Sequence, residues 1–207
     1  MMRENTMIAI WKSYGKYLVL GVIVAVLGYG GFQWRVQQRN AQMEQASLIY
    51  DKMISSFQQK ENSKTEEQGK QLMTHYRGTP YAALAALLLA RLQIEQNNLD
   101  KAVEHLQLAM KLGEEGPVGP IARVRLARVL ASKQQFEQAL KLLESEIILG
   151  YVPLIEEARG DIYVMQDHLD KAREAYTRAL QALPMGVSVM SLQLKQNDLN
   201  LYKKEDS

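Results

Sequence analysis

The sequence predicts an all-α protein: a single N-terminal membrane helix, then a solenoid of paired helices, closed by a C-terminal capping helix. Three observations predict this fold class. The chain carries no charge between Lys16 and Arg35. A similar fifteen-residue segment occurs three times, at residues 96 to 110, 133 to 147 and 166 to 180. Within each copy the apolar residues keep the spacing of one helix face, so the repeated unit is helical.

Composition limits the classes of function. A chain of 207 residues is long enough for one domain or a little more, and 47% hydrophobic with 23% charged residues is typical of a globular protein. Cysteine is absent, which excludes disulfides, thiolate metal sites and a cysteine nucleophile. The net charge of +2 gives no electrostatic reason to expect nucleic-acid binding.

Residues 17 to 35 are predicted to form a transmembrane anchor after a short N-terminal tail, residues 1 to 16. The uncharged stretch spans roughly 27 Å as a helix, close to the hydrocarbon thickness of a bilayer. Aromatic residues flank both ends, as expected at the depth of lipid head groups. They are Trp11, Tyr14, Tyr17, Tyr29, Phe32 and Trp34. The alternatives are a buried core helix, which rarely carries two aromatic belts, and a cleaved signal peptide, for which Gly28-Tyr29-Gly30 is a poor cleavage site.

Charge does not decide which side of the membrane the following domain faces. The basic residues near the anchor are Arg3, Lys12 and Lys16 before it and Arg35, Arg39 and Lys52 after it. Because the two flanks are equal, the rule that places the more positive flank in the cytoplasm gives no answer. Basic and acidic residues also balance over residues 35 to 207, so this part has no general attraction to anionic lipid.

Residues 36 to 207 are predicted to form the repeat domain. Ala102, Ala139 and Ala172 hold the same place in the three copies, at spacings of 37 and 33 residues, and Gly69 lies 33 residues before the first. A period near 34 is typical of arrays of paired helices. A second helical segment precedes each copy across a short polar turn, so we expect the small residue to let the two helices of a unit approach closely.

The last unit combines small, aromatic and helix-breaking residues in a fixed order: Gly160, Tyr163, Ala172, Tyr176, Ala179 and Pro184. On these residues the unit resembles a tetratricopeptide repeat. The other units match less well, since Ala90 and Ala127 replace the glycine and the first unit is assigned mainly by its spacing. The predicted units are residues 42 to 77, 83 to 116, 120 to 152 and 153 to 186. Val187, Met190 and Leu194 predict a capping helix at about residues 187 to 202, as the exposed end of an array needs.

The order of motifs along nearly the whole chain points to a particular family. A membrane helix ending in GGFQWRV is followed by ASLIYDKM, YAALAALLLARLQIEQNNLDKA, IARVRLARVLASKQQFEQAL, RGDIYVMQDHLDKAREAY and MSLQLKQNDLNL. On these motifs the chain resembles the ancillary SecYEG translocon subunit family, the YfgM-like proteins. The resemblance implies a single-pass protein of the bacterial inner membrane with a cytoplasmic N-terminus and a periplasmic repeat domain. It also implies association with the SecYEG translocon, a membrane-anchored periplasmic chaperone (PpiD-like) and exported clients.

No catalytic constellation is recognisable, so we expect a protein that is not an enzyme and has no metal or cofactor. His75, His105 and His168 fall in different units, and no acidic residue lies near them at metal-ligand spacing. Such histidines are typical of protein surfaces.

Two further features have ordinary structural interpretations. The glycines of KLGEEGPVGPI, residues 111 to 121, alternate with prolines, which suits a connection between units better than a phosphate-binding loop. The neighbouring acids Glu156 and Glu157, like Glu114 and Glu115, are interpreted as solvated charges.

The predicted binding surface is the face formed by the first helices of the units, where stacked helices can hold an extended or helical partner segment. Aligning the units by their alanines places Arg91, Arg128 and Asp161 at one position on successive first helices, with Arg125 and Glu157 nearby. We predict these five residues as candidates for protein binding. The alternative is that they pair only with one another, as surface ion pairs worth about 0 to 1 kcal/mol each.

The classes of function left open differ in where the repeat domain lies. One is an interaction protein at the secretion translocon, which holds a chaperone or a nascent chain near the exit. Another is a receptor that faces the cytosol, and a third is a scaffold for a different membrane complex. Alkaline phosphatase fused after Ser207 separates the first from the second, because the enzyme is active only if the domain is exported.

Overall fold

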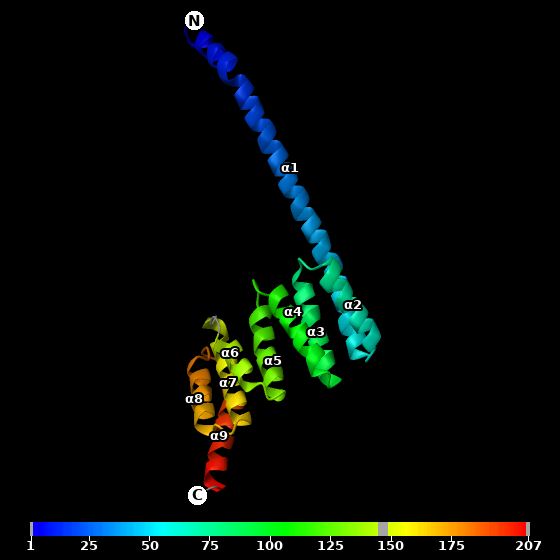
Figure 1. The fold of residues 1–207 in the computed structure, drawn as a ribbon. Helices are drawn as coiled ribbons and strands as arrows, with labels where there is room; N and C mark the ends of the chain where they lie inside the picture. The colour runs from blue at the N-terminus through cyan, green and yellow to red at the C-terminus, as the bar shows by residue number, and fades with distance from the viewer. Residues whose placement is uncertain (1, 145–148, 206–207) are drawn as a thin grey trace. The chain divides into compact units, whose positions relative to one another are not determined.

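The computed structural model describes the backbone of residues 2 to 144 and 149 to 205 and the side chains of residues 26 to 144 and 150 to 199. This part of the chain contains helices and no strand, which confirms the predicted all-α class (Figure 1). It divides into two compact units, Met1–Gln45 and Ala46–Ser207, which are described separately below.

The helices follow one another with short connections. Their bounds are α1 (Met2–Gln58), α2 (Asn62–His75), α3 (Pro80–Glu95), α4 (Leu99–Leu112), α5 (Val118–Ser132), α6 (Phe136–Glu144), the 3-10 helix η1 (Leu149–Tyr151), α7 (Val152–Met165), α8 (Leu169–Gln181) and α9 (Met190–Glu205). Proline in the first turn favours the start of α3, at Pro80, and of α7, at Pro153, because the first amides of a helix have no partner within it.

The first unit consists of the N-terminal part of α1. The apolar and aromatic side chains of Val26, Leu27, Tyr29, Phe32 and Trp34 are 64 to 69% exposed. Of the predicted anchor, residues 17 to 25 lie outside the described side chains, as does the predicted tail. Within the described residues, no helix combines the length and the apolar character needed to cross a membrane.

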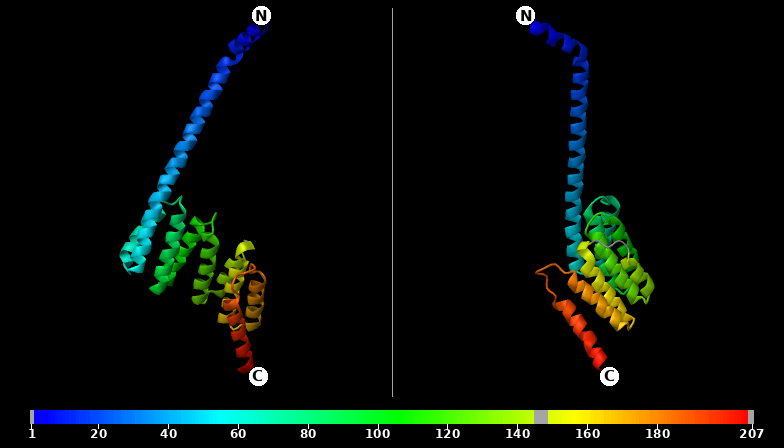
Figure 2. Two further views of the ribbon diagram at one scale, coloured as in Figure 1. Left: turned by 180° about the vertical axis from the view of Figure 1, so that it is seen from behind. Right: turned by 90° about the vertical axis from the view of Figure 1, so that its left-hand side faces the viewer.

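The second unit is an array in which each helix packs on its neighbours along the chain (Figure 2). Residues 46 to 58 of α1 pair with α2, since Met53 shares a core cluster with Leu72 and lies against Gly69. The pairs α3 and α4, α5 and α6, and α7 and α8 follow. Helices α3, α5 and α7 are therefore the first helices of their units. This arrangement confirms the predicted solenoid of paired helices.

The four turns within the pairs share one backbone conformation. A residue with φ between 60° and 63° stands in each, in the left-handed region that non-glycine residues seldom adopt. These residues are Lys60, Asn97, Gln134 and Asp167. The next residue donates its N–H to a carbonyl five positions back, over 2.8 to 2.9 Å, as in a Schellman motif. The turns thus define the register of the units, at spacings of 37, 37 and 33 residues.

This register confirms three of the predicted contact positions and corrects the fourth. Ala102, Ala139 and Ala172 lie five residues after the left-handed residue and are completely buried. In the first unit that position is held by Thr65, also completely buried, and not by Gly69. Gly69 lies four residues later, about one helical turn, so it is on the same face. A small residue fits either place, and the spacing alone therefore selected the wrong one.

A second pair of positions sets how closely the helices of each unit approach. The residue seven positions before the left-handed residue faces the one nine positions after it. In the first unit a Cβ added to Gly69 would lie 2.8 Å from the Cε of Met53. In the last unit a Cβ added to Gly160 would lie 2.2 Å from the Cε1 of Tyr176. The glycine is thus on the second helix in one unit and on the first helix in the other.

The middle units hold residues of intermediate size at the same two positions. Ala90 and Leu106 belong to one core cluster, and Ala127 and Leu143 belong to the next. All four are buried. Every unit therefore combines a smaller residue with a larger one.

The last helix, α9, covers the end of the array with a different face from the one predicted. Among its described side chains, Leu192 and Leu199 are buried and pack in a core cluster with Ala172, Tyr176 and Ala179. The apolar residues that predicted the helix, Val187, Met190 and Leu194, are 49 to 68% exposed. The apolar pattern thus indicated a terminal helix but not the residues that pack it, because α9 carries apolar residues on more than one face and only one of these faces packs against α8.

Candidate partner-binding face

The five predicted residues lie on three successive first helices. Arg91 is on α3, Arg125 and Arg128 are on α5, and Glu157 and Asp161 are on α7. The structure divides them into two groups with different surroundings, and Lys195 of α9, which the sequence analysis did not consider, joins the second group.

Arg91 and Arg125 line a hollow of about 370 Å³, here called the α3–α5 groove. The other lining residues are uncharged, from the end of α1, from α3 and from the start of α5. They are Tyr50, Leu84, Leu87, Leu88, Pro117, Val118 and Ile121. No described residue that lines the groove is acidic. The groove therefore combines an apolar floor with two positive charges.

Both guanidinium groups of the groove are open to solvent. The Arg91 side chain is 64% exposed, its Nε lies 2.9 Å from Oε1 of Glu95, and its guanidinium carbon lies 5.1 Å from the ring centroid of Phe57. An exposed ion pair one helical turn apart contributes only about 0.3 to 0.5 kcal/mol, so a ligand can compete for Arg91. Arg125 is exposed and forms no ion pair with any described residue.

Arg128, Glu157 and Asp161 are held together with Lys195 in a set here called the α7–α9 charge cluster. Arg128 Nη2 lies 2.9 Å from Asp161 Oδ2 and 3.8 Å from Glu157 Oε1. Lys195 Nζ lies 2.6 Å from Asp161 Oδ1 and 2.7 Å from Glu157 Oε1. The two positive and two negative charges of this cluster sum to zero. Arg128, Glu157 and Asp161 therefore pair with one another, as the alternative interpretation predicts. The cluster offers little net charge to a partner.

Tyr176 of α8 fixes one side of this cluster. Its hydroxyl donates to Oδ1 of Asp161 over 3.0 Å, and its ring centroid lies 5.8 Å from Nζ of Lys195. Burial raises the pKa of Tyr176 well above its usual value, and the charge of Asp161 and the hydrogen bond raise it further. The hydroxyl therefore stays protonated and remains a donor. The same ring also closes the contact with Gly160.

A comparison with protein-family models identifies the fold family. The model described as "Tetratricopeptide repeat-like domain" matches residues 9–201. The chain belongs to this family. The match covers most of the chain and agrees with the four helix pairs and their common turns, so the residues discussed above all lie within a tetratricopeptide repeat-like domain.

Curated proteins similar to this tetratricopeptide repeat-like chain carry the name Ancillary SecYEG translocon subunit. One from Neisseria gonorrhoeae is 27% identical over 91% of each chain. One from Escherichia coli strain K12 is 25% identical over 96% of this chain and 97% of its own. One from Haemophilus influenzae is 27% identical over 83% of this chain and 84% of its own. The resemblance that the motifs indicated is thereby confirmed.

Within the tetratricopeptide repeat-like domain, Glu156 is a structural residue and not the solvated charge predicted. Only 5% exposed, it accepts hydrogen bonds from Arg159 Nη1 over 2.6 Å and from Arg178 Nε over 2.9 Å. Arg159 also donates to the carbonyl of Leu143 over 2.9 Å. Glu156 lies four residues before Gly160, on the face of α7 that packs against α8. That spacing was the available signal for its burial.

The remaining titratable candidates of the domain are dispersed. His75 and His168 are exposed, whereas His105 is half-buried and burial lowers its pKa. Among the residues that the structure describes, no three histidine or acidic side chains come together in a way that could hold a metal ion.

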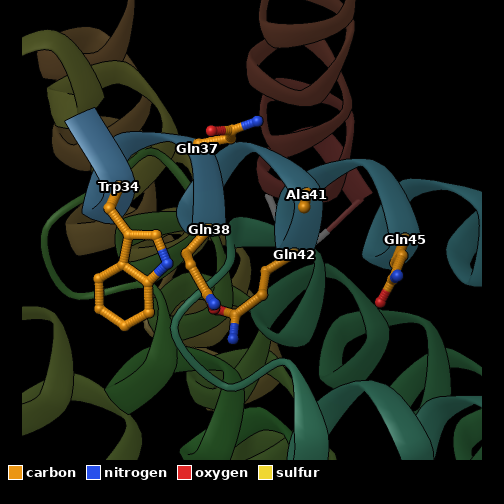
Figure 3. A pocket seen from close by; sticks show the side chains of 6 residues that line it. All are labelled: Trp34, Gln37, Gln38, Ala41, Gln42 and Gln45. Atoms are coloured by element: carbon orange, nitrogen blue, oxygen red, sulfur yellow. The ribbon is translucent and has the colours of Figure 1, made fainter. Parts of the chain in front are cut away.

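A second hollow lies on α1, in the first unit. Its volume is about 470 Å³, and Figure 3 shows that its lining side chains all project from that one helix. They are Trp34, Gln37, Gln38, Ala41, Gln42 and Gln45. Because one helix provides only one wall, this hollow is a weaker candidate than the α3–α5 groove, to which three helices contribute.

Proposed function

We propose that this chain is a membrane-anchored, non-enzymatic subunit that binds other proteins at the SecYEG translocon. The observation that carries the proposal is the similarity, over nearly all of both chains, to the Escherichia coli protein named Ancillary SecYEG translocon subunit. Two further observations support it. The repeat array presents a long helical face of the kind that binds partner segments, and the charged residues that the structure describes in it form no recognisable catalytic arrangement.

The proposed anchor is residues 17 to 35. It is supported by the absence of charge between Lys16 and Arg35 and by the exposed apolar side chains between Val26 and Trp34, which a bilayer would cover. The proposed topology is that of a single-pass protein of the bacterial inner membrane, with the N-terminus in the cytoplasm and the repeat domain in the periplasm. The family resemblance supports this orientation. The flanking charges give no support to either orientation, because they are balanced.

The proposed partners are the translocon itself, a membrane-anchored periplasmic chaperone of the PpiD-like kind, and exported proteins as clients. The family resemblance supports the chaperone and the clients. The proposed contact surface is the face of first helices that carries Arg91, Arg125, Arg128, Glu157 and Asp161. Its open part is the α3–α5 groove.

Affinity purification tests the proposal. The intact chain with a C-terminal tag, expressed in its own host and extracted in mild detergent, should recover the SecY, SecE and SecG proteins at levels well above an unrelated tagged membrane protein. Recovery equal to that control would contradict the proposal. Recovery of cytosolic import or scaffold proteins instead would favour one of the other classes of function.

The anchor and the orientation have their own test. Arginine at both Val24 and Val26 should release the chain from carbonate-washed membranes, because each charge at the centre of a membrane helix costs about 2.5 to 3.5 kcal/mol. Alkaline phosphatase fused after Ser207 should be active in the unaltered chain. An inactive but intact fusion would reverse the proposed orientation.

A further inference from the structure

The floor of the α3–α5 groove is suited to aliphatic side chains. Leu84 and Leu88 of α3 and Ile121 of α5 are only partly buried, and together with Tyr50 they leave apolar surface facing the hollow. Covering such surface is favourable in proportion to its area. A partner segment with leucine-like side chains would provide that cover.

The charged residues at the rim of the groove favour a partner of opposite charge. Arg91 and Arg125 are the charged residues that line it, both are exposed, and Arg125 has no ion-pair partner among the described residues. Guanidinium groups bind carboxylates through paired hydrogen bonds in a planar geometry that a lysine cannot reproduce. The groove therefore favours acidic side chains in the partner and opposes basic ones.

The rest of the first-helix face lacks this character. In the α7–α9 charge cluster, Lys195 of α9 takes the carboxylates of Glu157 and Asp161, which also pair with Arg128. A partner carboxylate at Arg128 would also meet Glu157 and Asp161, which already pair with it, whereas no described acidic residue lines the groove at Arg125. This difference limits the charge-selective part of the face to the region of Arg91 on α3 and Arg125 on α5.

From these observations we infer that the α3–α5 groove binds a short acidic and leucine-rich segment of a partner protein, with carboxylates on Arg91 and Arg125 and aliphatic side chains on the floor between them. The inference rests on the proposed function in one respect: it assigns the surface by which the chain would hold its partner. It names the chemistry of the partner segment, which the proposed function does not.

The test uses two fluorescent peptides of equal length with leucines at the same places, one with glutamate and one with lysine elsewhere. Each is titrated by anisotropy with the intact chain in nanodiscs of uncharged lipid, and binding to empty nanodiscs is subtracted. We expect the glutamate peptide to bind at least about tenfold more tightly than the lysine peptide, and added salt to weaken its binding. Equal affinities, or no binding of the glutamate peptide, would overturn the inference.

Matched variants locate the binding. Arg91→Glu with Arg125→Glu should weaken binding of the glutamate peptide at least about tenfold, and Arg91→Gln with Arg125→Gln should have an intermediate effect. Lys101→Glu with Lys141→Glu makes the same change of net charge at two exposed positions on α4 and α6, outside the groove, and should change the affinity less than about twofold. An equal loss in this control would mean that net charge, and not the groove, determines binding. Unfolding curves of all variants exclude loss of the fold.

The result is separable from the proposed function. If the intact chain recovers SecY but does not bind the glutamate peptide, the inference fails and the proposed function stands. If the peptide binds as expected but no translocon protein is recovered, the proposed function fails.

Discussion

The first and last helix pairs each pack a glycine against a large side chain, but the glycine lies on the second helix of the first pair and on the first helix of the last pair. In the first pair, Met53 on the first helix faces Gly69 on the second. In the last pair, Gly160 on the first helix faces Tyr176 on the second. The constraint is therefore on the combined size of the two side chains, and no particular residue is required at either position.

The two pairs differ in how easily the large side chain can move away from a Cβ added to the glycine. The two atoms nearest to a Cβ on Gly69 would be the Cε of Met53 and the Cδ1 of Leu89, both at the ends of flexible side chains, and the Cγ of Leu89 would follow at 3.0 Å. The ring that a Cβ on Gly160 would meet is rigid, buried and held by the hydrogen bond from Tyr176 to Asp161. We therefore expect equal changes in the two pairs to have unequal effects on stability.

Gly160→Ala should have the largest effect. The added Cβ would lie 2.2 Å from a ring carbon of Tyr176, and the ring can move only by losing its bond to Asp161 and disturbing the α7–α9 charge cluster. We expect the free energy of unfolding to fall by about 3 kcal/mol, because the overpacking outweighs the roughly 1 kcal/mol by which alanine is preferred to glycine inside a helix. Urea unfolding of the intact chain, followed by circular dichroism, measures it.

A double variant provides the control. Gly160→Ala with Tyr176→Leu recreates the combination that Ala127 and Leu143 form in the third unit. We expect the double variant to be at least about 1 kcal/mol more stable than the sum of the two single effects predicts, because the residues are in contact. Simple additivity would show that the two positions are not coupled.

Ala172→Leu should have the next largest effect, about 2 kcal/mol, because Ala172 is completely buried between the helices of the last pair. Its counterpart in the first pair is Thr65, whose hydroxyl donates to the carbonyl of Glu61 over 3.1 Å. Thr65→Ala introduces the residue found in the other units, so we expect it to cost no more than about 1 kcal/mol, the loss of one hydrogen bond. Thermal unfolding of both variants tests the register, and a larger cost for Thr65→Ala would argue against it.

Lys195→Met should cost about 1 kcal/mol. The ammonium group is partly buried and bonds two carboxylates at once, so its removal leaves Glu157 and Asp161 to share Arg128. The matched change near the start of the array is Lys64→Met, which removes an exposed pair with Glu61 and should cost less than about 0.5 kcal/mol. Equal losses of unfolding free energy in the two variants would mean that the cluster is no stronger than an ordinary surface pair.

Gly69→Ala should have the smallest effect. The contacts at 2.8 Å can be relieved by small rotations of Met53 and Leu89, and alanine is preferred to glycine inside a helix by about 1 kcal/mol. We expect the two terms nearly to cancel, leaving the urea midpoint almost unchanged. A loss as large as that of Gly160→Ala would refute the explanation based on rigidity.

Local pattern was sufficient to predict the helix pairs and their contact face. Ala102, Ala139 and Ala172 recur at one position because two helices touch there, and this recurrence is visible when the units are aligned. The position of Gly69 could not be settled in this way, because Thr65 and Gly69 are one helical turn apart on the same face. Only the left-handed turn at Lys60 distinguishes them, and lysine gives little signal for such a turn.

The candidate site was only partly predictable for a different reason. Arg91 and Arg125 could be placed on the first helices from the period alone. The pairing of Glu157 with Lys195 joins residues 38 positions apart, and it depends on which face of α9 packs against α8. The partner of Glu156 likewise could not be predicted, because Arg178 comes from the next helix. Such choices follow from tertiary contacts, which one sequence does not contain.

The four left-handed turns also bear on how the chain reaches its fold. Each turn closes two helices that are adjacent in sequence, so a complete pair needs only 27 to 33 consecutive residues. Contacts this local form rapidly, because little chain entropy is lost before they are made. A growing chain can thus complete its first pair while later ones are still unmade, and assembly can proceed from one end to the other in the order of synthesis.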